Sequence, residues 1–446
     1  MKLRLILGCL LLSGCGSDPI APGRVQLVQG LETDTWTRDP APVSIEVEKL
    51  LTDGERTPIA TLAGPSSAFS LDDSAVGRYD VLGKDASGTV QVRGTTLLMD
   101  PRGFAGVVLP LYMARTGEFS RPDVLERDVG ERPLLSLVYG RHLFAVGQDS
   151  QQSVVTESFD LAYWDTYRGL PNFTCPQGPC GFRSIATVLG SVVLGVGADF
   201  ASWYDIEYYR FKAADLPTGL SSFSEIAGGQ TIPGPEGSLF IVGGTRADSP
   251  TDKVLAISKT GVLSTIALVG PRSAAAATWI PERGLLVLGG SATAAGAELL
   301  APGATAFVPL PYAPDPTRGA SLAALDNARV LRIGGKNPDA SAAATVELSL
   351  ACGADCTLTP RGLPTNLDEA KSFVLGPEQL LSVGLTADGE TRALLLDGDQ
   401  QVELPLREPR RRASAARLPT GHVAIVGGTR VSDGTQARAV ELFTPR

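Results

Sequence analysis

The chain has 446 residues, 39 of them basic and 48 acidic, which gives a formal net charge of −9. This acidic balance argues against a nucleic-acid partner, and the length exceeds that of one ordinary domain. The 50 glycines, the 32 prolines and the lack of a long stretch with helical periodicity argue against a helical protein.

The N-terminus has the order of a secretory signal. A short basic segment precedes an apolar run over residues 5–12, which is too short to remain as a membrane span. The next residues, Leu12-Ser13-Gly14-Cys15, resemble a bacterial lipobox. The resemblance implies that residues 1–14 are a signal peptide and that Cys15 carries lipid. The alternative is an ordinary signal peptide followed by an incidental cysteine.

The residue after the lipobox indicates in which membrane the protein is expected. Gly16 follows the cysteine where aspartate would favour the inner membrane, so resemblance to lipoprotein sorting implies the bacterial outer membrane, facing the periplasm or the cell surface. Residues 15–23 are expected to form a flexible tether. The membrane is then one partner, reached through the lipid.

Six cysteines are present, and two local pairs remain once the signal is removed and Cys15 is acylated: Cys175 with Cys180, and Cys352 with Cys356. An even number of cysteines at short spacing in an exported protein predicts disulfides. A zinc site would need four converging ligands, and the chain has only two histidines.

Residues 24–115 alternate apolar and polar positions in short runs, as in Val43-Ser44-Ile45-Glu46-Val47. Turn residues separate these runs, which predicts a small β-sandwich. The order Gly77-x-Tyr79-x-Val81, followed by Asp85-x-x-Gly88, resembles immunoglobulin-like or carboxypeptidase-regulatory-like modules.

The rest of the chain repeats. Seven apolar segments each run into glycine, and the first glycines of the seven are residues 147, 197, 243, 289, 334, 384 and 427. Their intervals of 43 to 50 residues are typical of a β-propeller with one four-stranded blade per repeat. We therefore expect an all-β protein in which residues 116–446 form a seven-bladed propeller behind the small sandwich.

Two repeats show the pattern in full. One runs over residues 271–290 and ends at 297–300, and the last runs over residues 412–428 and ends at 440–443. They resemble kelch repeats of galactose-oxidase-like propellers, and the resemblance covers about three quarters of the chain. The chain departs from that pattern because its outer strands lack a regular tyrosine and tryptophan.

The last repeat stops about one strand short. A fourth strand would then have to come from elsewhere, and Gly117-Glu118-Phe119-Ser120 could supply it. Pairing of the two ends of the propeller would close the ring and leave no open edge.

A basic residue recurs just before the first strand of most repeats: Arg132, Arg183, Arg272, Arg318, Lys371 and Arg412. These residues could ring one mouth of the channel and bind an anion. They could instead bond backbone carbonyls or acids between blades. Recurrence in nearly every repeat favours the architectural interpretation.

The two histidines, His142 and His422, each lie five residues before a repeat glycine, in the turn between first and second strands. A copper radical oxidase of the galactose-oxidase type needs two histidines and two tyrosines around one metal. The turns that carry these histidines lie on the face opposite the loops between second and third strands. No metal and no other cofactor is therefore expected.

Aromatic residues are concentrated around the second repeat: 12 of the chain's 27 lie between residues 159 and 211. Five of them are candidates for a binding platform: Phe200, Trp203, Tyr204, Trp164 and Tyr167. The Cys175/Cys180 loop is expected on the same face. Rigid aromatics can receive a sugar ring or a partner protein. The alternative is that they cover an enlarged blade edge.

These observations predict a lipid-anchored envelope protein, monomeric and without catalytic residues, whose propeller recognises a glycan or a protein. A propeller enzyme of the epimerase or lyase type, acting on sugars, is one alternative. A structural scaffold without a small ligand is another.

Overall fold

The computed structural model describes residues 22–71, 76–149, 151, 153–166, 181–208, 210–244, 250–352, 356–362 and 366–446. The signal peptide, Cys15, Tyr167 and the Cys175/Cys180 pair lie outside the described residues. Helix in the described part is limited to three short 3-10 turns, η1 (Pro101–Phe104), η2 (Phe223–Glu225) and η3 (Pro235–Gly237). None of these could cross a bilayer.

The N-terminal strands form two sheets around one core. The five-stranded sheet has the order β3 (Arg56–Leu62), β2 (Ser44–Leu51), β5 (Gly77–Lys84), β6 (Val90–Thr95), β8 (Ala114–Arg115). The three-stranded sheet has the order β4 (Ala68–Ser70), β1 (Arg24–Val28), β7 (Val108–Tyr112). Strands β1 and β7 are parallel. Val25, Val47, Tyr79 and Leu111 are buried together in the core, because alternate residues of each strand face inward.

Seven antiparallel four-stranded sheets follow in the described part of the chain. The first four are β10 (Leu134–Val138), β11 (His142–Gln148), β12 (Val154–Asp160), β13 (Asp165–Thr166); β14 (Phe182–Val188), β15 (Val192–Gly197), β16 (Ala201–Asp205), β17 (Arg210–Ala213); β18 (Gln230–Pro233), β19 (Leu239–Val242), β20 (Thr251–Ile257), β21 (Leu263–Arg272); and β22 (Ala276–Ile280), β23 (Gly284–Leu288), β24 (Ala297–Leu300), β25 (Val308–Leu310).

The last three sheets complete the series. They are β26 (Ser321–Ala324), β27 (Arg329–Ile333), β28 (Val346–Ser349), β29 (Thr359–Pro360); β30 (Asp368–Gly376), β31 (Gln379–Leu385), β32 (Thr391–Asp397), β33 (Gln400–Leu404); and β35 (Ser414–Arg417), β36 (Val423–Val426), β38 (Glu441–Phe443), β9 (Phe119–Ser120). A separate short pair joins β34 (Arg410–Arg411) and β37 (Thr429–Arg430).

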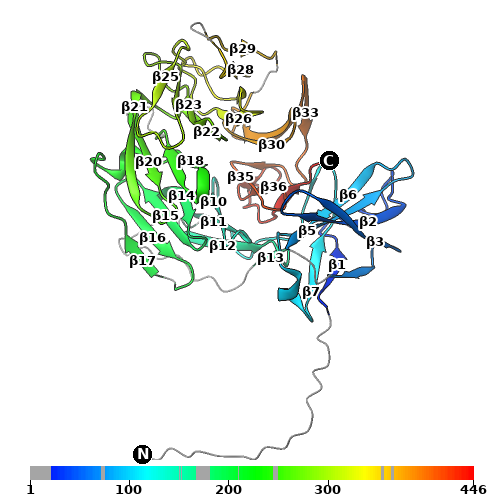
Figure 1. Ribbon diagram of the computed structural model, residues 1–446. Coiled ribbons are helices and arrows are strands. Elements are labelled where there is room, and N and C mark those ends of the chain that lie inside the picture. The colour runs from blue at the N-terminus through cyan, green and yellow to red at the C-terminus, as the bar shows by residue number, and fades with distance from the viewer. Residues whose placement is uncertain are drawn as a thin grey trace, which may run out of the picture.

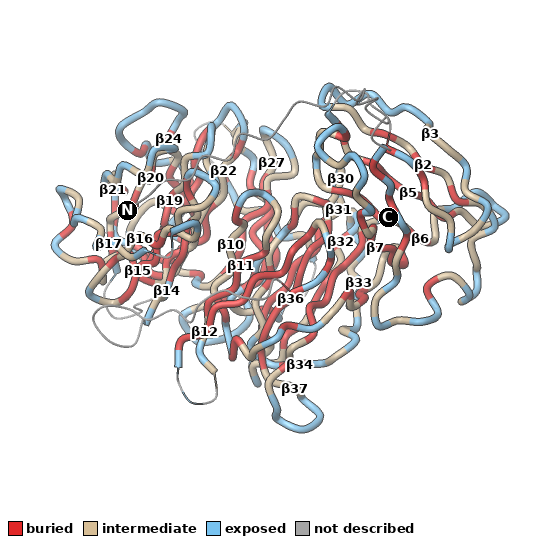
Figure 2. Tube along the Cα trace, turned by 90° about the horizontal axis from the view of Figure 1, so that it is seen from below, coloured by how far each residue is buried: buried red, intermediate tan, exposed pale blue. Residues whose placement is uncertain are grey.

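The seven sheets pack face to face, as Figure 1 shows. The first strand of each sheet contacts that of the next from β10 through β14, β18, β22 and β26 to β30, and β35 of the seventh sheet contacts β10 of the first. An apolar core fills the space between each sheet and its neighbour. Figure 2 shows buried residues along the strands and exposed residues in the connecting turns. The prediction of an all-β, propeller-like fold is confirmed.

The last sheet takes its fourth strand from the other end of the repeat region. Phe119 and Ser120 of β9 pair with Phe443 and Leu442 of β38. The rings of Phe119 and Phe443 lie 5.6 Å apart, and both are buried. The expectation that the segment around Phe119 supplies the missing strand is confirmed.

Four of the phased glycines, at positions 243, 289, 334 and 427, lie close to backbone atoms of the following repeat. Gly289 and Gly427 have φ values of +79° and +72°, which L-residues with a side chain rarely adopt. A Cβ on either residue would lie 2.7 Å from a backbone oxygen of the following sheet, that of Thr317 or of Gly130. At these four positions the repeated glycine meets a packing requirement between sheets.

The N-terminal sheets pack against the ends of the seventh and first sheets (Figure 1). Tyr112 of β7 packs on Trp164, with ring centroids 5.4 Å apart. Glu118 forms ion pairs with Arg38 on one side and with Arg407 on the other. These contacts hold the N-terminal domain and the repeat region in one orientation.

Candidate binding sites

One of the expected mouth arginines, Arg272, is a structural residue, and it has an equivalent in Arg410, which was not predicted. Arg272 is fully buried and donates to Glu298 at 2.7 Å and to the carbonyl of Gly289 at 2.8 Å. Arg410 is also fully buried and makes the same pair of contacts, with Glu441 and with the carbonyl of Gly427. Arg410, rather than Arg412, is therefore the structural equivalent of Arg272.

The other basic residues at this end are partly neutralised. Arg132 pairs with Glu369 at 2.6 Å and Arg412 with Glu131 at 2.8 Å. Lys371 donates to the carbonyl of Ala415. Arg183 and Arg318 are exposed. The architectural interpretation fits Arg272, and the ion pairs of Arg132 and Arg412 weaken the case for an anion-binding mouth.

The histidines lie apart from any metal-like cluster. His142 begins β11, and His422 immediately precedes β36. His422 is buried beside Trp164, and its Nδ1 lies 2.9 Å from the hydroxyl oxygen of Thr420. Burial lowers the pKa of His422 to about 4. Within the described residues, no group of three or more His, Cys, Asp or Glu side chains is arranged to hold a metal ion.

Two residues of the predicted aromatic platform are in the core instead. Tyr204 is buried and stacks on Phe211 with centroids 4.7 Å apart. Trp164 is buried between Tyr112 and His422. The expectation of exposed rings is wrong for both, because Tyr204 faces the core between the first and second sheets and Trp164 is covered by the N-terminal domain.

Phe200 and Trp203 are half-buried. Phe200 precedes β16, and its ring lies so close over Gly197 that a Cβ there would come within 2.4 Å of it. Trp203 packs at the edge of the core between the second and third sheets. Phe200, with Ser202 and Leu216, lines a hollow of about 320 Å³. Of the four platform residues that the structure describes, Phe200 is the one that lines this hollow.

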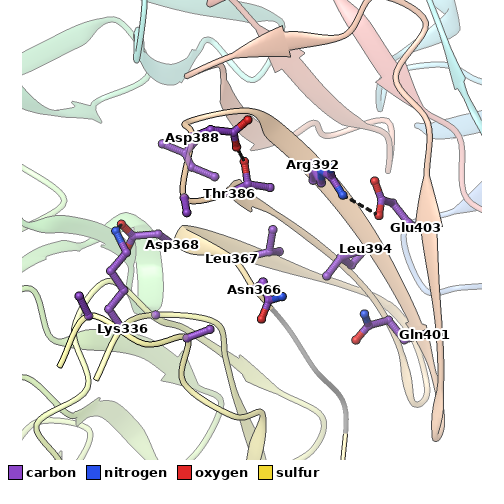
Figure 3. Close-up of a pocket in the computed structure, with 15 residues that line it drawn as sticks. Lys336, Asn366, Leu367, Asp368, Thr386, Asp388, Arg392, Leu394, Gln401 and Glu403 are labelled. Carbon is purple, nitrogen blue, oxygen red and sulfur yellow. Dashed lines mark hydrogen bonds and ion pairs between the residues drawn. The ribbon is translucent and has the colours of Figure 1, made fainter. Parts of the chain in front are cut away.

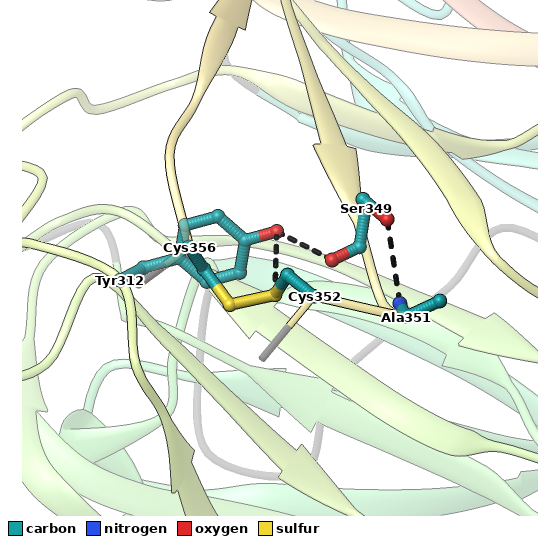
Figure 4. The surroundings of a disulfide bond; sticks show 5 residues. All are labelled: Tyr312, Ser349, Ala351, Cys352 and Cys356. Carbon is teal, nitrogen blue, oxygen red and sulfur yellow. Dashed lines mark hydrogen bonds between the residues drawn. A yellow bond between two sulfur atoms is a disulfide. The ribbon is translucent and has the colours of Figure 1, made fainter. Parts of the chain in front are cut away.

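The disulfide between Cys352 and Cys356 is present, as predicted (Figure 4). Its Cα atoms are 5.4 Å apart. The hydroxyl of Tyr312 donates to the carbonyl of Ser349 at 2.7 Å and also lies beside the sulfur of Cys352. The bridge therefore pins the end of β28 against the buried ring of Tyr312.

A group of exposed apolar side chains was missed at the sequence level. We call it the turn patch: Tyr139, Tyr163, Leu189 and Tyr208, which are 44% to 64% exposed. All four lie in turns at one end of the first and second sheets. The backbone N–H of Tyr139 donates to the carbonyl of Gly190, and Arg141 lies over the ring of Tyr163. The backbone bond between Tyr139 and Gly190 places the first-to-second-strand turns of the two sheets side by side.

Two members of the turn patch occupy unfavourable backbone positions. Tyr139 and Leu189 have φ values of +54° and +53°, and each is followed by a glycine with positive φ. This is the pattern of a type I′ turn, in which asparagine, aspartate or glycine is normally found first. A Tyr-Gly or Leu-Gly turn between two strands was the available sequence signal. Positive φ also recurs in the equivalent turns of other sheets, at Glu236, Glu282 and Glu378, so at Tyr139 and Leu189 it is the exposed apolar side chain that distinguishes the turn.

A polar cleft of about 550 Å³ opens between the fifth and sixth sheets (Figure 3). Lys336 and Asp368 form an ion pair at 2.6 Å on one side. On the other side, Arg392 pairs with Glu403 at 3.2 Å. Buried leucines lie between the two pairs. None of the described residues that line this cleft is aromatic.

The comparisons with known proteins concern the fold alone. The WD40 domain of Toxoplasma gondii coronin is 10% identical with a TM-score of 0.44, over 74% of this chain and 88% of that one. The extracellular domain of a hybrid two-component system from B. thetaiotaomicron is 9% identical with a TM-score of 0.44, over 73% of this chain. The match spans only 39% of that longer chain. No family model matches, and a search of curated proteins finds no relative. Likenesses this weak carry no conclusion about function, and kelch membership is not shown.

Proposed function

We propose that the chain is a non-catalytic recognition protein of the bacterial envelope, built as a seven-bladed, kelch-like propeller (residues 116–446) behind a β-sandwich (residues 24–115). The contacts between the seventh and first sheets support a closed ring. They share an apolar core that includes Ala424 and Ala145. The backbone N–H of Arg132 donates to the carbonyl of Arg412 at 2.6 Å.

The anchor in this proposal is a lipid on Cys15. It rests on the lipobox-like sequence and on the short tether of residues 15–23, after which β1 begins at Arg24. The lipid would hold the protein, as a monomer, at the outer membrane. The net charge of −9 supports a partner other than nucleic acid.

The ligand of the propeller in this proposal is a partner protein bound at the turn patch. The observation that carries it is the exposure of Tyr139 and Leu189 from adjoining strained turns. Tyrosine is among the side chains enriched at interface hot spots, and three of the four members of the turn patch are tyrosines. The patch also borders the contact between the repeat region and the N-terminal domain. Tyr163 of the patch is followed directly by Trp164, which packs against the N-terminal domain.

The test is the double variant Tyr139→Asn/Leu189→Asn. Asparagine suits the left-handed position, so the variant should be as stable as the wild type or more stable by about 1 kcal/mol. Loss of two hot-spot side chains should weaken partner binding at least about 30-fold. The partner is identified as the envelope protein that is cross-linked to the wild type. It is then purified, and its affinity for each variant is measured by interferometry.

The matched control is Val308→Asn, which removes an equally exposed apolar side chain from β25 of the fourth sheet. It should retain the partner with an affinity within twofold of the wild type. The proposal is refuted if the control and the double variant bind the partner equally well, or if no envelope protein distinguishes them.

A further inference from the structure

The cleft between the fifth and sixth sheets begins at the end of the sheets opposite to the turns that carry the turn patch, and it extends along β32 and β33 as far as Gln401. It is bordered by the connection from β27 to β28 and by the turn from β31 to β32, which both join second to third strands. The turn patch lies on connections from first to second and from third to fourth strands. In antiparallel sheets these two sets of turns are at opposite ends.

The floor of the cleft is apolar and continuous with the core. Leu367, Leu385 and Leu394 are buried there. On β32, Arg392 and Leu394 lie on the face towards the fifth sheet, whereas Ala393 between them packs towards the seventh sheet. One face of this strand therefore supplies both the rim and the floor of the cleft. Figure 3 shows the leucines between the two ion pairs.

The rim consists of planar polar side chains and one lysine. Carboxylate, guanidinium and amide groups surround the leucine floor: Asp368, Asp388, Glu403, Arg392, Asn366, Gln401 and Lys336. Such groups can donate to and accept from neighbouring hydroxyls in pairs. A pyranose ring has the complementary surface, with an apolar face of C–H groups and a polar edge of hydroxyls. A volume of about 550 Å³ falls in the usual range for small-ligand sites.

The charged groups of the cleft further restrict the class of ligand that can bind there. Lys336 is matched by Asp368, and Arg392 is held by Glu403 and also by Glu390. Asp388 is exposed, and its carboxylate accepts from the hydroxyl of Thr386. Arg411, outside the cleft lining, is the cation that acts on it electrostatically, and the described lining itself holds three carboxylates against two cations. The cleft therefore carries an excess of negative charge, which disfavours acidic ligands and favours a cation near Asp388.

We infer that this cleft is a saccharide site that accepts neutral sugars, prefers an amino sugar and rejects acidic sugars. The leucine floor receives the apolar face of a ring. Arg392 and Glu403 bind hydroxyls on one side, and Asp388 receives the ammonium group. This site is separate from the surface proposed for the partner protein.

The experiment is calorimetric titration of the unacylated mature chain (Cys15→Ser) at pH 6.5. The probes are three trisaccharides: maltotriose, tri-glucosamine and trigalacturonic acid. We expect tri-glucosamine to bind at least about 5-fold more tightly than maltotriose, and trigalacturonic acid to show no binding. Arg392→Gln should weaken both binding probes, and Asp388→Asn should weaken only tri-glucosamine, bringing it to the affinity of maltotriose.

The matched control is Asp433→Asn, since Asp433 is also an exposed carboxylate that accepts from a threonine hydroxyl, that of Thr435. Its substitution should leave all three affinities unchanged. Equal loss of tri-glucosamine binding in Asp433→Asn and Asp388→Asn would show a general charge effect and overturn the inference. Failure of all three probes at millimolar concentration, or preference for the acidic probe, would also overturn it.

Discussion

The buried pair of Arg410 and Glu441 gives a sharp test of what holds the last sheet in place. Arg410 donates to Glu441 at 2.7 Å and to the carbonyl of Ala439 at 2.9 Å, and both charged side chains are fully buried. Arg410→Met retains much of the volume but removes the cation and every donor. Removing one member of a buried pair costs about 3–5 kcal/mol, and we expect a loss of that size at pH 7.

The loss should depend on pH. Burial raises the pKa of Glu441 above its ordinary value of 4.5, and removal of Arg410 should raise it further. A carboxyl with a raised folded-state pKa favours folding at pH values below the unfolded pKa, and this contribution disappears as pH rises through the folded pKa. The difference in unfolding free energy between wild type and Arg410→Met should therefore be small at pH 4.5 and grow towards pH 7.

The assay is urea unfolding followed by tryptophan fluorescence at several pH values. The double variant Arg410→Met/Glu441→Gln should recover part of the loss, because no unpaired charge remains buried. Arg132→Gln, which breaks the exposed ion pair with Glu369, should cost no more than about 1 kcal/mol. The reasoning fails if Arg410→Met costs no more than Arg132→Gln, or if its cost is independent of pH.

Two further predictions concern the ends of the chain. Radiolabelled palmitate should be incorporated into the wild type and not into Cys15→Ala, and equal labelling of both would disprove the anchor. Burial lowers the pKa of His422 to about 4, so its protonation favours unfolding, and up to about 3 kcal/mol of stability should be lost as pH falls from about 6.5 towards 4. His422→Phe should reduce that acid-side loss in thermal melts, and an unchanged pH profile would disprove it.

The repeat architecture could be predicted from the sequence because its signals are local. An apolar strand followed by glycine recurs in each repeat, and in four repeats that glycine lies against the backbone of the following repeat, as Gly289 and Gly427 do. The strand at Phe119 followed from counting the strands of the last repeat. Register was harder: Arg410 and Arg412 are two residues apart, and only the contacts of Arg410 identify it as the equivalent of Arg272.

The candidate sites could not be predicted in the same way. Whether an aromatic side chain is exposed depends on which neighbour faces it, and for Trp164 that neighbour is Tyr112 of another domain. Tyr139 and Leu189 lacked the aromatic clustering that drew attention to the second repeat, and their exposure depends on the turn conformation. The polar cleft joins Lys336 to Asp368 across two sheets, so no short sequence pattern contains it.

The packing of each sheet against its neighbours is compatible with both proposed sites in one chain. Strain at Tyr139 and Leu189 can persist only because the sheets beneath them are fixed on both sides, by cores that include Val138, Ile185 and Val188. The cleft depends on the same rigidity, since its leucine floor is the end of a core between sheets. The two sites lie on different sheets and share no residue. A protein partner on the turn patch would therefore leave the cleft open to a saccharide, and the protein could hold both at once.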